Sequence, residues 1–294
     1  MLNQKSSETV LPILNALTVD VEDYFQVSAF TAEVPRHQWS SFESRVCANT
    51  QRLLNLFDEA GVRGTFFVLG WVAEHFPGLV RDIQHAGHEL ASHSYGHELV
   101  YDQSPQEFLA DLRQAQRAIE DASGLAVRGY RAPSYSITKS SLWALDVLAE
   151  QGYTFDSSIY PIRHDRYGIP DWTRHPHEVK RAGGSFWELP GSTIQCLGAN
   201  LPIGGGGYFR LLPYGWTRAG IRSVNEIEGR PAIFYLHPWE IDPDQPRIRC
   251  SVASRVRHYH NLHKTEARLK RLLSSFRFGT VSDVLDTIRP RGTA

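Results

Sequence analysis

Cysteine is scarce in this chain of 294 residues, and no long hydrophobic run is present. The three cysteines, Cys47, Cys196 and Cys250, lie far apart without a Cys-x-x-Cys pair, which indicates free thiols in a reducing compartment and no disulfide framework. No stretch reaches the roughly 18 apolar residues that a membrane span needs. The N-terminal segment lacks the pattern of a secretory signal. We therefore expect a cytoplasmic protein with no transmembrane segment.

An excess of charge of either sign is also missing. The chain has 31 basic and 32 acidic residues, for a formal net charge of -1. Nucleic-acid binding normally calls for a basic surplus, so we expect no nucleic-acid partner. Hydrophobic residues are 41% and charged residues 21%, a balance typical of globular proteins.

Short apolar, β-branched segments alternate with longer amphipathic ones. The patterns predict strands at 16–21, 64–69, 88–92, 127–130, 153–155, 185–189 and 232–236, and helices at 44–60, 71–86, 104–121, 139–151 and 213–228. Repeated strand–helix units imply a parallel sheet, because parallel neighbours need a helical crossover. Segment 160–184 is predicted to be a long loop or insertion, and the glycine-rich segment 198–214 a flexible lid or turn.

Three polar clusters follow predicted strands. Asp20, Glu22 and Asp23 close the first strand, and crowded carboxylates of this kind need a compensating cation. His93 and His97 are four residues apart, so on one helical turn they would converge on a single face.

The third cluster is His237, directly after the last strand. Each cluster alone has an ordinary structural explanation, but their occurrence in order at successive strand ends favours chemistry. Two histidines and a carboxylate, with open positions, form a common hydrolytic metal site. Active sites of (β/α) barrels lie at the carboxyl ends of the strands, so we favour a barrel.

These residues resemble the motifs of the polysaccharide deacetylase family, also called the NodB-homology or carbohydrate esterase family four group. The five matching segments are 16–23, 93–97, 131–135 (Arg-Ala-Pro-Ser-Tyr), 153–158 and 235–237. The resemblance implies a distorted (β/α) barrel of about seven parallel strands. It also implies one domain over 1–294, with the motifs at 16–240 and an extension at 241–294. The start Asp-Val-Glu-Asp-Tyr-Phe and the later His-Pro-Trp-Glu resemble a subgroup associated with bacterial exopolysaccharide export.

The resemblance implies a metal-dependent hydrolase that removes N-acetyl groups from amino sugars of a polysaccharide or its lipid-linked precursor. In such an enzyme Asp20 would be the general base, and Arg131 would keep it ionised. The backbone N–H of Tyr135 would help to stabilise the oxyanion. His237 would be the general acid, and Asp156 would orient it and raise its pKa.

His93 and His97 would be the metal-binding histidines. The family pattern has two adjacent aspartates, but Val21 follows Asp20 here. Glu22 lies on the same side of an extended strand as Asp20 and is the favoured carboxylate ligand, with Asp23 the alternative. Zinc is the first candidate metal, although this set of ligands also accepts cobalt, nickel or manganese.

Several late residues have less specific interpretations. Trp239, within an aromatic-rich region, is a candidate sugar-binding residue, and so is Tyr135. The histidines at 258, 260 and 263 and the basic residues Lys264, Arg268, Lys270 and Arg271 are interpreted as a solvated helix. Attraction to a membrane glycolipid is the less favoured alternative.

Two other functions remain open from the sequence. An allantoinase-like hydrolase of a cyclic amide would keep much of the same fold and would need a small closed pocket. A catalytically inactive carbohydrate-binding relative would lack at least one motif residue, and all of them are present here.

Overall fold

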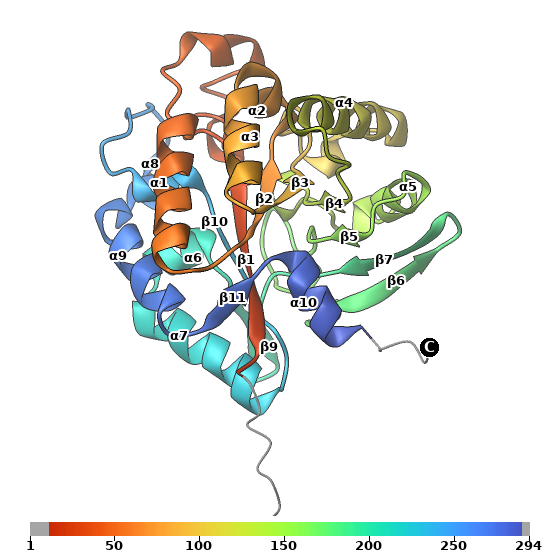
Figure 1. Ribbon diagram of the computed structural model, residues 1–294, viewed down its shortest axis with the longest axis vertical. Helices are drawn as coiled ribbons and strands as arrows, with labels where there is room; N and C mark the ends of the chain where they lie inside the picture. The colour runs from red at the N-terminus through yellow and green to blue at the C-terminus, as the bar shows by residue number, and fades with distance from the viewer. Residues whose placement is uncertain (1–11, 290–294) are drawn as a thin grey trace, which may run out of the picture.

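The computed structural model describes residues 12–289, and a curved, mostly parallel sheet forms its centre (Figure 1). Its strands are β1 (Leu14–Val21), β2 (Thr65–Val68), β3 (Glu89–Ser92), β4 (Gly129–Tyr130), β5 (Phe155–Asp156), β6 (His177–Arg181), β7 (Gly184–Glu188), β10 (Ile233–Leu236) and β11 (Arg277–Gly279). The order is β10-β1-β2-β3-β4-β5-β7-β6, and β11 also pairs with β1. The expected α/β class with a mainly parallel sheet is confirmed.

Seven strands, from β10 through β1 to β7, run parallel, and β6 is added antiparallel at one edge. Within the described residues β10 and β6 are the two ends of the path and do not pair with each other. The barrel is therefore distorted and open. A separate hairpin of β8 (Thr193–Cys196) and β9 (Ala199–Pro202) lies outside this sheet.

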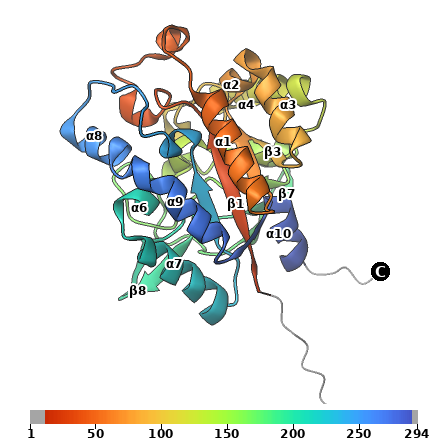
Figure 2. The same cartoon turned by 60° about the vertical axis from the view of Figure 1, so that its left-hand side comes forward.

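Helices surround the curved sheet, most of them on its outside (Figures 1 and 2). They are α1 (Val46–Glu59), α2 (Gly70–His75), α3 (Pro77–His85), α4 (Pro105–Ser123), α5 (Ala144–Glu150), α6 (Gly206–Leu211), α7 (Tyr214–Arg222), α8 (Val252–Tyr259), α9 (Leu262–Leu273) and α10 (Val281–Ile288). At α4 the predicted capping box is present, with Ser104 and Glu107 satisfying each other's backbone N–H groups.

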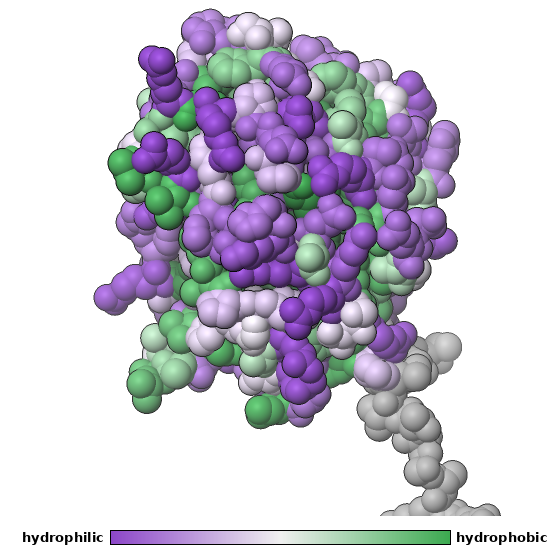
Figure 3. Space-filling model, turned by 90° about the vertical axis from the view of Figure 1, so that its left-hand side faces the viewer, coloured by the Kyte–Doolittle hydropathy of each residue, from purple (hydrophilic) through white to green (hydrophobic). Residues whose placement is uncertain are grey.

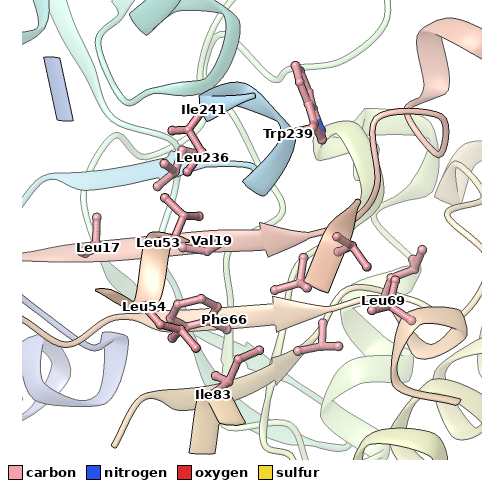
Figure 4. Packing of buried hydrophobic residues seen from close by; sticks show 14 of the residues in the cluster. Leu17, Val19, Leu53, Leu54, Phe66, Leu69, Ile83, Leu236, Trp239 and Ile241 are labelled. Atoms are coloured by element: carbon pink, nitrogen blue, oxygen red, sulfur yellow. The ribbon is translucent and has the colours of Figure 1, made fainter. Parts of the chain in front are cut away.

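The period-two alternation of β1 separates its core face from its functional face. Leu17, Val19 and Val21 join a large hydrophobic cluster with residues of α1, α3 and α9 (Figure 4). Because successive side chains of a strand point to opposite faces, Thr18 and Asp20 point to the inside of the curved sheet. The helices thus bury one face, and the other can hold polar groups.

The structure departs from the predicted elements where local chemistry interrupts a pattern. The helix predicted over 71–86 is two helices, because Pro77 starts a new one after the non-helical Phe76. The loop predicted over 160–184 includes strand β6, and the lid predicted over 198–214 includes β9 and α6. The proline-rich composition of 160–184 and the glycine-rich composition of 198–214 predicted irregular structure, so these short elements were missed.

The C-terminal segment is built into the fold. Strand β11 pairs with the start of β1, and Val281, Val284 and Leu285 of α10 pack against Ala16, Phe67 and Ile233 inside the sheet. The face in Figure 3, which includes the α8 and α9 side of the molecule, is mostly hydrophilic with scattered hydrophobic residues. Among the described residues, no helix has the length and apolar character that crossing a bilayer requires.

Candidate active site

Glu22, His93 and His97 converge at the carboxyl edge of the sheet. One ligand atom from each lies within 4.8 Å of the other two, and all three side chains are buried. Glu22 directly follows β1, and His93 directly follows β3. The carboxylate and histidines that the sequence singled out are therefore brought together as a candidate metal site.

The sequence spacing suggested that the two histidines share a helical turn. In the structure they do not. Residues Ser94 and His97 have φ values of 68° and 54°, which no α-helix tolerates. The loop is held instead by Asp111 of α4, whose carboxylate accepts hydrogen bonds from the Ser94 hydroxyl and the Tyr95 N–H. Convergence thus comes from a tightly held loop.

The chemistry of this cluster fits a divalent cation. Nδ1 of His93 lies 2.8 Å from the backbone carbonyl of Arg131, which favours a proton on Nδ1 and leaves Nε2 free as a ligand. Glu22 Oε2 lies 2.7 Å from His97 Nε2, yet it is buried and accepts no hydrogen bond among the described residues. Burial opposes ionisation of Glu22, but the neighbouring His97 lowers its pKa to about 2. An ionised, incompletely satisfied carboxylate beside two imidazoles is a suitable donor set.

Asp23, the alternative ligand, accepts hydrogen bonds at the start of α1. Its Oδ2 atom accepts hydrogen bonds from the backbone N–H groups of Arg45 and Val46, at 2.8 and 3.1 Å, and from the Ser44 hydroxyl. These contacts satisfy orphan N–H groups at the start of α1, where no cap from the N-cap side chain exists. The geometry therefore places Glu22, and not Asp23, at the candidate metal site.

Asp20 lies beside the triad and is paired with a buried arginine. Arg131 Nη1 is 2.6 Å from Asp20 Oδ1, and the same guanidinium donates to Thr18 and to Ser157. Its remaining face lies over the Phe67 ring. Because every polar edge of Arg131 has a partner, the guanidinium is fixed and can hold Asp20 in one orientation.

His237 occupies the opposite side of the same group. Its Nε2 atom is 3.8 Å from Asp20 Oδ2 and 3.6 Å from Glu22 Oε1. Its Nδ1 atom is 2.5 Å from Oε1 of Glu240, and Glu240 is in turn bound by Arg210 at 2.8 Å. Burial opposes protonation of His237, but the Glu240 hydrogen bond and the nearby carboxylates raise its pKa to about 9.

The predicted role of Asp156 as the partner of His237 is therefore wrong, because Glu240 makes that contact. Asp156 instead lies next to Glu188 on adjacent strands, with both residues fully buried. Burial raises the pKa of Asp156 to about 6 and raises that of Glu188 well above its usual value. Asp156 Oδ2 and Glu188 Oε2 have no hydrogen-bond partner among the described residues, so a proton shared between them would satisfy both.

Tyr135 lines the cleft, but its backbone is engaged in its own turn. The N–H donates to the Ala132 carbonyl at 3.2 Å, which leaves it poorly placed for the predicted oxyanion role. Ser134 and Tyr135 both have φ values just above 50°. The Tyr135 ring packs with Tyr160 and Tyr235 in a small aromatic cluster. A direct oxyanion contact would require the turn to rearrange.

Trp239, predicted to bind sugar, lines the cleft but is almost fully buried. Its ring is stacked between the imidazoles of His237 and His258, with centroid separations of 5.0 and 4.1 Å. The indole N–H donates to Glu22 Oε1 at 3.2 Å. These contacts show that Trp239 packs against and helps to position the site residues His237 and Glu22.

The extension beyond residue 240 contributes to the site, which the sequence did not reveal. His258 is buried and its Nε2 lies 2.7 Å from Gln245, so it is not part of a solvated helix face. Arg268 donates to the carbonyls of Phe209, Arg210 and Leu212 at the end of α6. The predicted basic surface is thus partly structural support for the helix that carries Arg210.

A cleft of about 220 Å³ joins all these parts. Its floor holds Asp20, Glu22, His93, His97 and His237. Its walls come from segments that the sequence did not connect to the site: Val27, Ser28, Leu99, Tyr101, His164, Arg166, Tyr167, Gly207, Arg210, Arg257 and His258. The walls of the cleft therefore come from early, middle and late segments of the chain.

An α/β fold with a His–His–carboxylate centre at the carboxyl edge of its sheet defines the class of this protein. Residues 34–155 match the polysaccharide deacetylase model, and residues 157–286 match a domain of unknown function (DUF3473). Residues 34–155 therefore form a polysaccharide deacetylase domain, as the sequence motifs had indicated.

Curated relatives match about a third of this chain. The chain is 29% identical over 98 residues to a peptidoglycan-N-acetylglucosamine deacetylase of Bacillus cereus, covering 33% of this chain and 36% of that protein. It is 33% identical over 90 residues to the Listeria monocytogenes enzyme of that name, covering 31% and 19%. A chitooligosaccharide deacetylase of Azorhizobium caulinodans is 29% identical over 85 residues, covering 29% and 40%. The chain thus spans well under half the length of these relatives.

Solved structures extend the similarity to the whole fold. A Mycobacterium smegmatis protein assigned to the polysaccharide deacetylases superposes with a TM-score of 0.67 at 21% identity, covering 95% of this chain and 90% of that one. A family 4 carbohydrate esterase from Streptomyces lividans gives 0.50 at 18% identity, covering 91% of each. At these identities the superpositions establish the fold and not the substrate.

Proposed function

We propose that this protein is a metal-dependent deacetylase that removes N-acetyl groups from amino sugars of a glycan. The observation that carries the proposal is the single cleft in which Glu22, His93 and His97 face Asp20 and His237. The names of the Bacillus cereus and Azorhizobium caulinodans relatives support N-acetylated saccharides as the substrate class. The substrate we favour is an exopolysaccharide or its lipid-linked precursor.

A divalent cation bound by Glu22, His93 and His97 would polarise the acetamide carbonyl and acidify a water molecule. Zinc is the metal we expect, with cobalt, nickel or manganese as substitutes, because imidazole and carboxylate ligands suit all four. The residues around this centre perform the proton transfers.

Asp20 is placed to accept the proton of the attacking water, and the ion pair with Arg131 holds its carboxylate in one orientation. The water oxygen forms a bond to the acetyl carbon, and the C–N bond then breaks. His237 is placed to protonate the departing amine, and its raised pKa keeps that proton available at neutral pH. Base and acid flank the carbonyl position from two sides.

The test is acetate release from N-acetylglucosamine oligomers by metal-reconstituted protein, beside an Asp20→Asn variant. The variant keeps the size and the hydrogen-bonding capacity of the side chain but removes its basicity. We expect release by the native protein and a loss of about 10²- to 10⁴-fold in the variant, with the metal still bound. Equal release by both proteins would contradict the assignment of Asp20 as base.

A further inference from the structure

Most charged side chains that line the cleft are matched by a partner of opposite charge or by a fixed hydrogen bond. Asp20 pairs with Arg131, and Glu22 lies against His97. Arg210 pairs with Glu240. The charges on the cleft floor are therefore balanced within the protein.

Arg166 and Arg257 are the exceptions among the charged residues of the cleft. Neither guanidinium lies within 4.0 Å of a carboxylate in the described part of the chain, and both are exposed at the rim. Arg166 lies in the segment between β5 and β6, and Arg257 lies in the last turn of α8. Two cations from distant segments thus face the same cleft without a counter-charge.

The backbone around both arginines is held in place. The N–H of Arg166 donates to His164 Nδ1 at 3.2 Å, and the His164 ring stacks on Tyr167 with centroids 3.9 Å apart. The carbonyl of Arg257 accepts a hydrogen bond from Arg210 at 2.9 Å, which ties the end of α8 to the Glu240 pair. The two rim positions are therefore anchored to the site itself.

The charges of both arginines affect the pKa of His164, which lines the same cleft. Burial is the largest cause of the lowered pKa of His164, and the charges of Arg257 and Arg166 lower it further, against the opposing effect of Asp165. The charges of Arg257 and Arg166 therefore both reach the same wall of the cleft, although burial has the larger effect on His164.

The cleft also continues past Arg166. A neighbouring hollow of about 530 Å³ shares Arg166, Tyr101, Leu99 and Ser28 with the cleft, and its further lining includes Arg36, Glu98 and Asp102. A saccharide chain with one unit over the catalytic floor therefore has room for a further unit beside Arg166.

We propose that this rim is a binding site for an anionic group of the glycan, a carboxylate or a phosphate, held by Arg166 and Arg257. The inference rests on the proposed deacetylase function and narrows its substrate to acidic acetamido glycans. Guanidinium groups suit both anions because their planar N–H donors match two oxygens at once. Both arginines lie in residues 157–286, the part outside the deacetylase model, so this specificity belongs to the second half of the chain.

The experiment compares acetate release from three oligosaccharides of equal length. One contains only N-acetylglucosamine, one alternates N-acetylglucosamine with glucuronate, and one carries a terminal phosphate. The proteins are the native chain, Arg166→Gln and Arg257→Gln, with Arg163→Gln and Arg255→Gln as controls. The controls are exposed arginines of the same two segments that do not line the cleft.

We expect the native protein to have a higher kcat/KM for at least one anionic oligosaccharide than for the neutral one. The ratio of anionic to neutral kcat/KM should fall about fivefold in each of the two rim variants, the upper range for an exposed ion pair. The controls should keep the native ratio, and added salt should reduce it. Preference for glucuronate assigns the site to a carboxylate, and preference for the terminal phosphate assigns it to a phosphate.

An anionic-to-neutral ratio that is unchanged in both rim variants would overturn the inference while leaving the deacetylase function intact. If no oligosaccharide releases acetate, the proposed function fails, and calorimetric binding to the metal-loaded protein decides the inference separately. Salt-sensitive binding of an anionic oligosaccharide that weakens in Arg166→Gln but not in Arg163→Gln supports the anion site. Equal binding of neutral and anionic oligosaccharides overturns it.

Discussion

Nδ1 of His237 lies 2.5 Å from Oε1 of Glu240, three residues later in the same turn. The Pro238–Ile241 turn brings the two side chains together, and Arg210 holds the other carboxylate oxygen. A residue that orients the acid should affect the chemical step more than substrate binding. We therefore expect Glu240→Gln to lower kcat about 10- to 100-fold with little change in KM.

The structure assigns the orientation of His237 to Glu240, whereas the sequence motifs pointed to Asp156. The variant Asp156→Asn distinguishes the two assignments. Asp156 has no contact with His237, so its variant should lose clearly less of kcat than Glu240→Gln does. Steady-state kinetics on an N-acetylglucosamine oligomer measure both. A larger kcat loss in Asp156→Asn would show that Glu240 is not the residue that orients the acid.

Glu22 and Asp23 are neighbours with different tasks, and metal content distinguishes them. Glu22→Gln removes a buried anionic ligand, so we expect the protein to bind less than one zinc per chain at metal concentrations that saturate the native protein. Asp23→Ala removes the hydrogen bonds to the start of α1 and should lower the free energy of unfolding by about 2 kcal/mol. Its zinc content should stay at one per chain.

Elemental analysis of dialysed protein and urea titration check these two outcomes. Loss of zinc in a folded Asp23→Ala variant, with full zinc in Glu22→Gln, would reverse the ligand assignment.

Trp239 should act on metal affinity and not on sugar affinity. Trp239→Phe keeps an aromatic ring between His237 and His258 but removes the N–H that donates to Glu22. Because hydrogen bonds to a metal ligand tune its orientation, we expect the dissociation constant for zinc to rise about tenfold. A competition titration with a chelator measures it. A raised KM for saccharide with unchanged zinc affinity would restore the sugar-platform interpretation.

The parts of the site that sequence could reveal are those with local patterns. Period two in β1 places Asp20 on the inner face of the sheet, and the strand ends locate Glu22, His93 and His237. Glu240 also had a signal, because it stands three residues after His237, which is the spacing of a capping box. That signal was outweighed by the family motif that pointed to Asp156.

Other parts depend on tertiary contacts that have no local signature. The burial of His258 results from stacking on Trp239, and the binding of Arg210 to Glu240 joins residues 30 positions apart. Polar residues on α8 and α9 are typical of a solvated face when read alone. Only packing against α6 and the 238–241 turn makes His258 and Arg268 internal.

The carboxyl pair of Asp156 and Glu188 makes stability depend on pH. Carboxyl groups in an unfolded chain ionise near their usual pKa of about 4, but both groups have raised pKa values in the fold, Asp156 at about 6. The folded state therefore holds more protons than the unfolded state above about pH 4. The stabilising contribution is present at low pH and is lost as pH rises through the folded pKa values.

Glu188→Gln removes one of the two titrating groups while its amide can still accept from the Ile159 N–H and donate to Asp156. Relative to the native protein, we expect the variant to gain about 1 to 2 kcal/mol of stability between about pH 5 and about pH 8. Urea unfolding at the two pH values measures this gain. Glu178→Gln, a partly exposed position on β6, is the matched control and should show no such gain. An identical pH dependence in native protein and Glu188→Gln would mean that both carboxyl groups are already ionised in the fold.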